Sequence, residues 1–100
     1  MGIHILVVDD EKELADVLEL YLMNDGYTVH KCCTGAEALS CIEHTEMDLA
    51  ILDVMLPDMD GFQICRRIRE KSFYPIIMLT ARAADGDKIM GLTIGADDYI

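Results

Sequence analysis

Acidic and hydroxyl side chains follow the apolar segments of this 100-residue sequence, at positions where they can support metal or phosphate chemistry. Asp9 and Asp10 come directly after the first apolar run, Asp53 ends a later one, and Thr80 ends another. Parallel strands bring their carboxyl ends to one edge of a sheet, where ligands of open α/β folds bind. We therefore expect three carboxylates and one hydroxyl to meet, although they are far apart in the sequence.

The three carboxylates together favour a bound cation. Taken alone, an Asp pair can cap a helix and a single Asp can end a strand. Two carboxylates about 5 Å apart, however, repel by roughly 3 kcal/mol at an effective dielectric constant near 20. A hard divalent cation removes this repulsion, and oxygen ligands at a partly open site suit Mg²⁺. The sequence thus predicts a magnesium site built on Asp9, Asp10 and Asp53.

Asp53 is the best candidate for a nucleophile, because it stands alone whereas Asp9 and Asp10 form a pair. A carboxylate beside Mg²⁺, with the Thr80 hydroxyl opposite, can accept a phosphoryl group. The cation neutralises charge on the phosphoryl oxygens, and the hydroxyl donates a hydrogen bond to one of them. The predicted chemistry is phosphoryl acceptance.

Several other activities are disfavoured. The acidic loop at 9–11 repels phosphate unless a cation intervenes, which argues against nucleotide binding of the Rossmann or flavodoxin kind. The sequence contains neither Gly-x-x-x-x-Gly-Lys-Ser/Thr nor Gly-x-Ser-x-Gly. A haloacid-dehalogenase-like phosphatase needs a second acid two residues after its nucleophile, and that position is Met55.

Alternating patterns predict the elements that position these residues. Compact apolar runs predict buried strands, and apolar residues at helical spacing predict helices. The expected order is strand 3–8, helix 12–24, strand 27–32, a helix opened by a capping box at 34–37, strand 48–53, helix 62–71, strand 75–80, helix 85–94 and strand 97–100. This alternation indicates an α/β fold with right-handed crossovers and a mainly parallel sheet covered on both faces.

Composition limits the partners and the compartment. The chain is 52% apolar with a net charge of −11, which predicts one folded domain that repels nucleic acid and anionic membranes. No apolar run has the length of a membrane span and no leader opens the chain, so we expect a cytoplasmic protein. Its four cysteines lack a Cys-x-x-Cys spacing and are expected to be reduced thiols.

Four segments make the chain resemble the receiver domain of bacterial two-component response regulators. They are Ile-Leu-Val-Val-Asp-Asp-Glu at 5–11, Asp-Val-Met-Leu-Pro-Asp-Met-Asp-Gly at 53–61, Ile-Met-Leu-Thr-Ala-Arg at 77–82 and Gly-Ala-Asp-Asp-Tyr-Ile at 95–100. The resemblance covers residues 1–100 as one receiver domain, in the style of OmpR-type transcription factors and of vancomycin-resistance-type regulators. It implies a flavodoxin-like (CheY-like) doubly wound parallel sheet with strand order 2-1-3-4-5.

The resemblance also implies roles for the acidic residues. Asp53 would accept the phosphoryl group from a phosphohistidine of a sensor histidine kinase. Asp10 and Asp53 would bind Mg²⁺ directly, Asp9 would bind it through water, and the main-chain carbonyl of Met55 would complete the protein ligands. The only chemistry would be this phosphotransfer and slow self-dephosphorylation, and the output of the full-length protein would be control of transcription. The alternative is an interaction domain that keeps the fold but does not depend on phosphorylation.

Further residues would transmit or tune the signal. Thr80 would be the switch hydroxyl and Tyr99 the coupled switch aromatic. Met55 and Arg82 occupy positions that influence how fast water removes the phosphoryl group. Pro57 and Gly61 look like residues that shape a loop.

One departure from the family pattern concerns the end of the sequence. The family carries a Lys followed by Pro two residues beyond Ile100, and then a final helix. We therefore expect a truncated domain that binds Mg²⁺ but accepts phosphate poorly, since no other lysine is an evident replacement (Lys12, Lys31, Lys71 and Lys88). The apolar surface left by the missing helix further predicts an oligomer, domain-swapped or otherwise.

Overall fold

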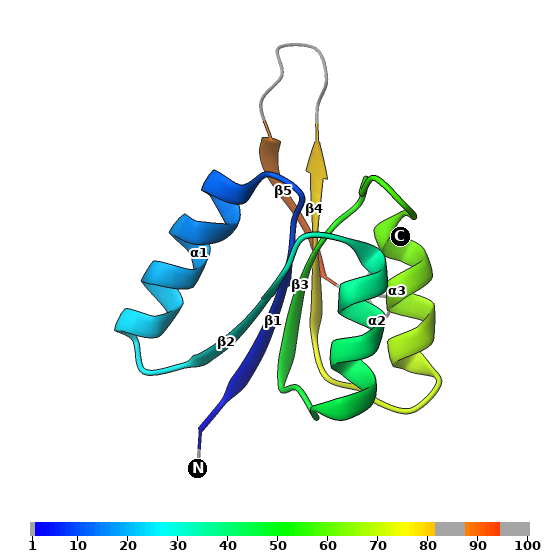
Figure 1. Cartoon of the computed structure of the whole chain (residues 1–100), viewed down its shortest axis with the longest axis horizontal. Helices are drawn as coiled ribbons and strands as arrows, with labels where there is room; N and C mark the ends of the chain where they lie inside the picture. The colour runs from blue at the N-terminus through cyan, green and yellow to red at the C-terminus, as the bar shows by residue number, and fades with distance from the viewer. Residues whose placement is uncertain (1, 82–87, 95–100) are drawn as a thin grey trace.

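The computed structural model shows a five-stranded sheet with helices on both faces, and it describes residues 2–81 and 88–94, with side chains as far as Leu79. The sheet order is β2-β1-β3-β4-β5. Helix α1 covers one face, and α2 and α3 cover the other (Figure 1). The elements are β1 (His4–Val8), α1 (Lys12–Asn24), β2 (Thr28–Cys32), α2 (Gly35–His44), β3 (Leu49–Asp53), α3 (Gly61–Arg69), β4 (Ile76–Ala81) and β5 (Lys88–Ile94).

The central strands are buried on both faces, which explains their continuous apolar sequences. Successive side chains of a strand point to opposite faces. In β1, Leu6 and Val8 belong to the core beneath α2 and α3, whereas Ile5 and Val7 belong to the core beneath α1. All four are buried. The α/β fold predicted from these runs is confirmed.

Parallel pairing aligns the strand ends at one edge of the sheet. Strand β1 pairs in parallel with β2 and β3, and β3 pairs in parallel with β4. Val8 lies opposite Leu52, so the residues that follow them, Asp9 and Asp53, occupy neighbouring positions on adjacent strands. Adjacent strands are about 4.8 Å apart. The register alone therefore brings two distant carboxylates together.

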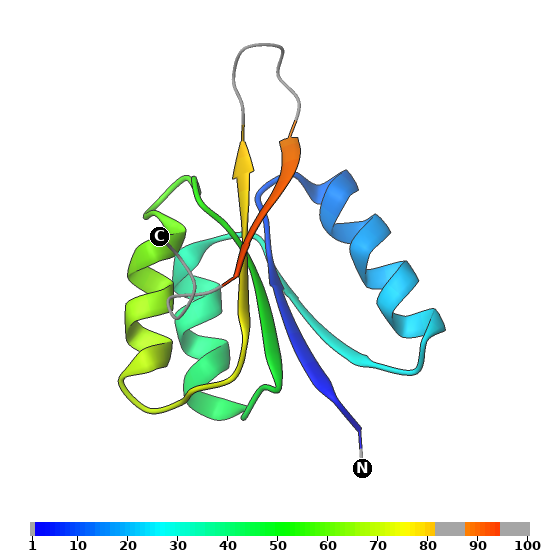
Figure 2. The same ribbon diagram turned by 180° about the vertical axis from the view of Figure 1, so that it is seen from behind.

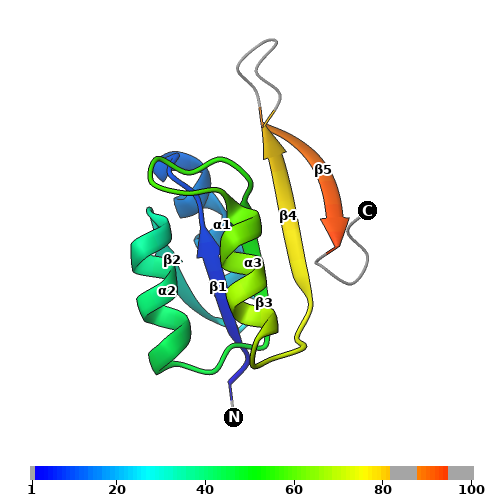
Figure 3. The ribbon, with the colours of Figure 1, turned by 90° about the vertical axis from the view of Figure 1, so that its right-hand side faces the viewer.

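The predicted fourth helix over 85–94 is wrong over the residues that the structure describes. Residues Lys88–Ile94 form β5, which runs antiparallel to β4. Figures 2 and 3 show the two strands side by side and pointing in opposite directions. Within the described residues, β5 takes the fifth position of the sheet, next to β4, whereas the sequence predicted a strand at 97–100 for that position. The latter strand lies outside the described residues, as do Arg82 and Tyr99.

The local sequence explains this strand. Ile89, Thr93 and Ile94 are β-branched and favour extended backbone, whereas Gly91 disfavours a helix by about 1 kcal/mol relative to Ala. Strand β4 would otherwise present unpaired backbone groups on its outer side, and pairing with β5 satisfies them. These preferences outweigh the helical spacing on which the predicted helix was based.

The amino-terminal end of α2 is capped by its own sequence, in a slightly different form from the predicted capping box. The Thr34 hydroxyl accepts a hydrogen bond from the Glu37 backbone N–H at 3.2 Å, as the pattern predicts. The Glu37 carboxylate accepts from the backbone N–H of Cys33 at 2.8 Å, one residue before the expected partner.

A second cap on α2 comes from a distant residue, Asp58. Its two carboxylate oxygens accept hydrogen bonds from the backbone N–H groups of Gly35 and Ala36, at 2.8 and 3.0 Å. These hydrogen bonds lower the pKa of Asp58 below 3.8, because they stabilise the charged form. Asp58 thereby ties the loop after β3 to the start of α2.

The lowered pKa of Asp58 predicts a pH-dependent contribution to stability. The Asp58→Asn variant should have a smaller free energy of unfolding at pH 7, since an amide provides only one acceptor oxygen for the two N–H groups. The folded-state pKa lies below the unfolded value, so the advantage of the wild type is complete above pH 3.8 and is lost as the pH falls further. Urea unfolding at pH 7, 5 and 3 measures the difference in free energy of unfolding between the wild type and this variant. Asp25→Asn, at the exposed end of α1, is the charge-matched control; a constant difference at every pH would contradict this account.

Candidate metal and phosphoacceptor site

Three carboxylates meet beyond the carboxyl ends of β1 and β3. Asp9, Asp10 and Asp53 each offer one oxygen, and these oxygens lie within 4.8 Å of one another. Asp9 and Asp53 are fully buried, whereas Asp10 is exposed. The cluster is therefore held inside the protein and opens to solvent on the Asp10 side.

Asp9 is fixed by both of its neighbouring elements. Its backbone N–H donates to the carbonyl of Cys32 at the end of β2, at 3.1 Å. Its carboxylate accepts from the backbone N–H of Glu11, just before α1, at 2.8 Å. Burial raises the pKa of the Cys32 thiol to about 12, so this cysteine stays protonated and contributes its backbone rather than its sulfur.

Asp53 is fixed by the backbone that follows it. Its carboxylate accepts from the N–H of Met55 at 3.3 Å. The next residue, Val54, donates to the carbonyl of Leu79 in β4 at 3.0 Å and accepts from the N–H of Gly61 at 2.7 Å. The end of β3 is thus held by β4 on one side and by the first residue of α3 on the other.

The donor set fits a hard divalent cation. All three side chains are carboxylates, and two of them are buried. At 4.8 Å, two such charges repel by about 3 kcal/mol at an effective dielectric constant of 20. Oxygen donors with an opening to water are the surroundings that Mg²⁺ prefers. The residues present therefore fit Mg²⁺.

Comparison with known proteins agrees with this geometry. The family described as response regulator receiver domain matches residues 5–100. This chain belongs to that family. Regulatory protein VanR of Enterococcus faecium is 61% identical over 100 residues, and regulatory protein VanRc of Enterococcus gallinarum is 52% identical. All 100 residues of this chain align with each relative, and they span 43% of that relative's length.

Solved receiver domains share the fold. A CheY-like receiver domain protein from Methanospirillum hungatei is 31% identical, with a TM-score of 0.78 over 85% of this chain and 69% of that one. The response regulator TrrA from Thermotoga maritima, solved in complex with Mg²⁺ and BeF, is 37% identical, with a TM-score of 0.74 over 83% of this chain and 72% of that one. The predicted resemblance to receiver domains is confirmed.

The other expected site residues are placed only in part. Thr80 follows Leu79, the register partner of Asp53, so its backbone reaches the same edge of the sheet. Met55 is 68% exposed, and its backbone forms an isolated bridge with Asp60. The ammonium group of Lys31, one of the lysines considered as a replacement, pairs with Asp16 and Glu19 of α1.

Gly61 makes a contact that its expected loop-shaping role did not specify. A Cβ atom built on this residue would lie well under 3 Å from the backbone carbonyl oxygen of Asp53. Only a glycine lets the start of α3 come this close to the end of β3. Next to it, Asp60 and Gln63 form a reciprocal capping box, with hydrogen bonds of 2.9 and 3.3 Å.

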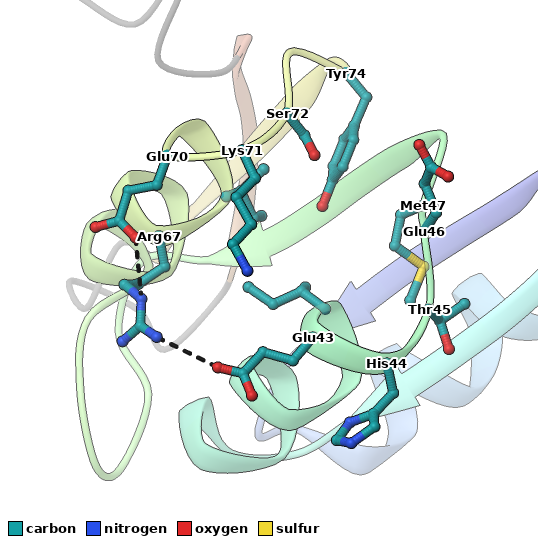
Figure 4. Close-up of a pocket in the computed structure, with 12 residues that line it drawn as sticks. Glu43, His44, Thr45, Glu46, Met47, Arg67, Glu70, Lys71, Ser72 and Tyr74 are labelled. Carbon is teal, nitrogen blue, oxygen red and sulfur yellow. Dashed lines mark hydrogen bonds and ion pairs between the residues drawn. The ribbon is translucent and has the colours of Figure 1, made fainter.

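A separate pocket of about 360 Å³ lies between the carboxyl-terminal ends of α2 and α3 (Figure 4). Arg67 pairs there with Glu43 at 3.5 Å and with Glu70 at 3.6 Å. These ion pairs are exposed and each contributes less than about 1 kcal/mol. The pocket lies away from the acidic cluster, and we assign the functional site to the cluster.

No helix in the described part of the chain is both long and apolar enough to cross a membrane.

Gly61→Ala should reduce the free energy of unfolding by about 1–3 kcal/mol, because the new methyl group meets rigid backbone. Gly35→Ala is the matched control, since both glycines are the first residues of helices and the three atoms nearest to an added Cβ at Gly35 all belong to the side chain of Met59, which can move. We expect Gly35→Ala to cost less than about 1 kcal/mol. Urea unfolding measures both, and equal losses would contradict the proposed backbone contact.

Proposed function

We propose that residues 1–100 form a receiver domain that accepts a phosphoryl group on Asp53 from the phosphohistidine of a sensor histidine kinase. The convergence of Asp9, Asp10 and Asp53 supports this proposal. In it, Asp10 and Asp53 would bind Mg²⁺ directly, Asp9 would bind it through water, and the main-chain carbonyl of Met55 would complete the protein ligands. The Mg²⁺ in the related TrrA complex agrees with this choice of cation.

Phosphoryl transfer needs few groups beyond these. A carboxylate oxygen of Asp53 attacks phosphorus, the bond from phosphorus to the imidazole nitrogen breaks, and the imidazole leaves with its electron pair and takes up a proton. The product is an acyl phosphate. Bound Mg²⁺ supplies charge neutralisation at the phosphoryl oxygens. The N–H of Met55 holds the carboxylate of Asp53 in place before the reaction.

Other residues complete the proposal. Thr80 serves as the switch hydroxyl, which donates a hydrogen bond to the phosphoryl group, and Tyr99 serves as the coupled switch aromatic. Met55 and Arg82 tune the rate of hydrolysis of the acyl phosphate. The position of Thr80 one residue beyond the partner of Asp53 supports its assignment.

The output and the setting are also proposals. The relatives are named regulatory proteins, and this chain spans 43% of their length. We infer that a DNA-binding domain elsewhere in the full-length protein controls transcription in the cytoplasm. The receiver domain itself contacts neither nucleic acid nor membrane, and it turns over no other substrate.

Incubation with phosphoramidate tests the acceptor. We expect one phosphoryl group to be added, slowly or quickly, and only when Mg²⁺ is present. Hydroxylamine should remove this group, because it cleaves acyl phosphates. Asp53→Asn should lower the Mg²⁺-dependent labelling by at least about 100-fold, since it removes the nucleophile. Asp25→Asn is the control for loss of one surface carboxylate.

Intact-protein mass spectrometry gives the readout. Equal labelling of the Asp53→Asn variant, or equal labelling after Mg²⁺ is removed with a chelator, would contradict the proposal. An interaction domain independent of phosphorylation predicts no Mg²⁺-dependent labelling of the wild type.

A further inference from the structure

Two histidines face each other across strands β1 and β2, near the edge of the sheet opposite the acidic cluster. The Nδ1 atom of His4 lies 2.9 Å from the Nε2 atom of His30. The ring centroids are 5.1 Å apart and the ring planes differ by 21°, so the two imidazoles lie nearly parallel. One N–H···N hydrogen bond joins them, and both rings are partly buried.

The backbone holds both histidines in place before any ligand binds. The N–H of His4 donates to the carboxylate of Asp48 at 2.8 Å, and the N–H of Asp48 donates to the carbonyl of His4 at 2.7 Å. His30 is in the middle of β2, where it pairs in register with Leu6 of β1. Alternation along the strands places both imidazoles on the sheet face that carries Leu6.

We propose that His4 and His30 form a binding site for a late divalent transition-metal ion such as Ni²⁺. Imidazole nitrogen suits these ions, and metal–nitrogen bonds of about 2.0–2.1 Å at a right angle place two nitrogens about 2.9 Å apart. The observed separation of His4 Nδ1 and His30 Nε2 is 2.9 Å. Adjacent ligand positions of an octahedral ion are therefore within reach of this pair once each ring turns, so that its nitrogen points at the ion and not at the other ring, and water completes the coordination.

Binding keeps the proton count unchanged. In the neutral pair, one ring donates the shared N–H and the other accepts it. For both nitrogens to bind a metal ion, the donating ring takes its other tautomer, with the proton moved to its outer nitrogen, and no proton is lost overall. Burial and the nearby His4 lower the pKa of His30, which keeps this ring neutral and available at neutral pH.

This site is separate from the acidic cluster in place and in chemistry. The cluster provides carboxylate oxygens, which suit Mg²⁺, whereas the histidine pair provides nitrogens. A late transition-metal ion here would link the edge strand β2 to β1. It would leave the carboxylates beyond the other ends of these strands available to Mg²⁺.

Calorimetric titration with Ni²⁺, in the presence of excess Mg²⁺, tests the proposal. Ni²⁺ is the probe because it binds imidazole and does not oxidise the free thiols. We expect His4→Gln and His30→Gln each to lower the affinity for Ni²⁺ at least about tenfold, since each removes one of two anchoring nitrogens. His44→Gln is the matched control, because His44 is exposed and its Nδ1 atom lies 2.7 Å from the carbonyl oxygen of Ser40, away from the pair.

Paramagnetic broadening gives a second readout on the unmodified protein, which does not depend on how the variants fold. Substoichiometric Ni²⁺ should broaden the NMR signals of His4 and His30 before those of His44. Absence of Ni²⁺ binding, unchanged affinity in both variants, or first broadening at His44 or at the acidic cluster would each overturn the proposal.

Discussion

Repulsion between carboxylates brought into register is the constraint on which the rest of this receiver domain depends. Asp9 and Asp53 follow paired positions of adjacent parallel strands, and both side chains are fully buried. A one-residue slip of either strand would move every side chain to the opposite face and disrupt the packing of both cores, so the core fixes this register. The core therefore enforces a concentration of negative charge that a divalent cation relieves.

The surrounding backbone adds rigidity where that charge is concentrated. Hydrogen bonds from β2, β4 and the first residue of α3 hold the segments that carry the acids. Gly61 permits the closest of these approaches, and Asp58 extends the support to α2. The loop between Asp53 and Asp60 is thus held at several points. It contacts both α2 and α3.

Much of this arrangement was predictable from the sequence. Continuous apolar runs predicted β1, β3 and β4, because strands buried on both faces need apolar residues throughout. The acids at their ends indicated the site, since parallel strands align their carboxyl ends. Gly26 follows the end of α1 with a φ angle of +92°, a conformation that a glycine after a helical pattern indicates.

The features that the sequence did not predict depend on tertiary contacts, which local sequence patterns mark weakly or not at all. The link from Asp58 to Gly35 joins residues 23 positions apart, and no local pattern marks it. The imidazole pair of His4 and His30 is visible only once β1 and β2 are in register. Residues 88–94 carry both a helical and an extended pattern, and pairing with β4 determines which one forms.

A double-mutant cycle on Asp9→Asn and Asp53→Asn, measured by urea unfolding without divalent cations, tests the central claim most directly. Asparagine keeps an acceptor oxygen for the hydrogen bonds to Glu11 and Met55 while it removes the charge. Each single substitution should stabilise the protein, and the double variant should gain about 1–3 kcal/mol less than the sum, because the same repulsion can be relieved only once. Saturating Mg²⁺ should abolish the gain from each single substitution. Gains that add to within about 0.5 kcal/mol would show that the two carboxylates do not repel, and would contradict the account.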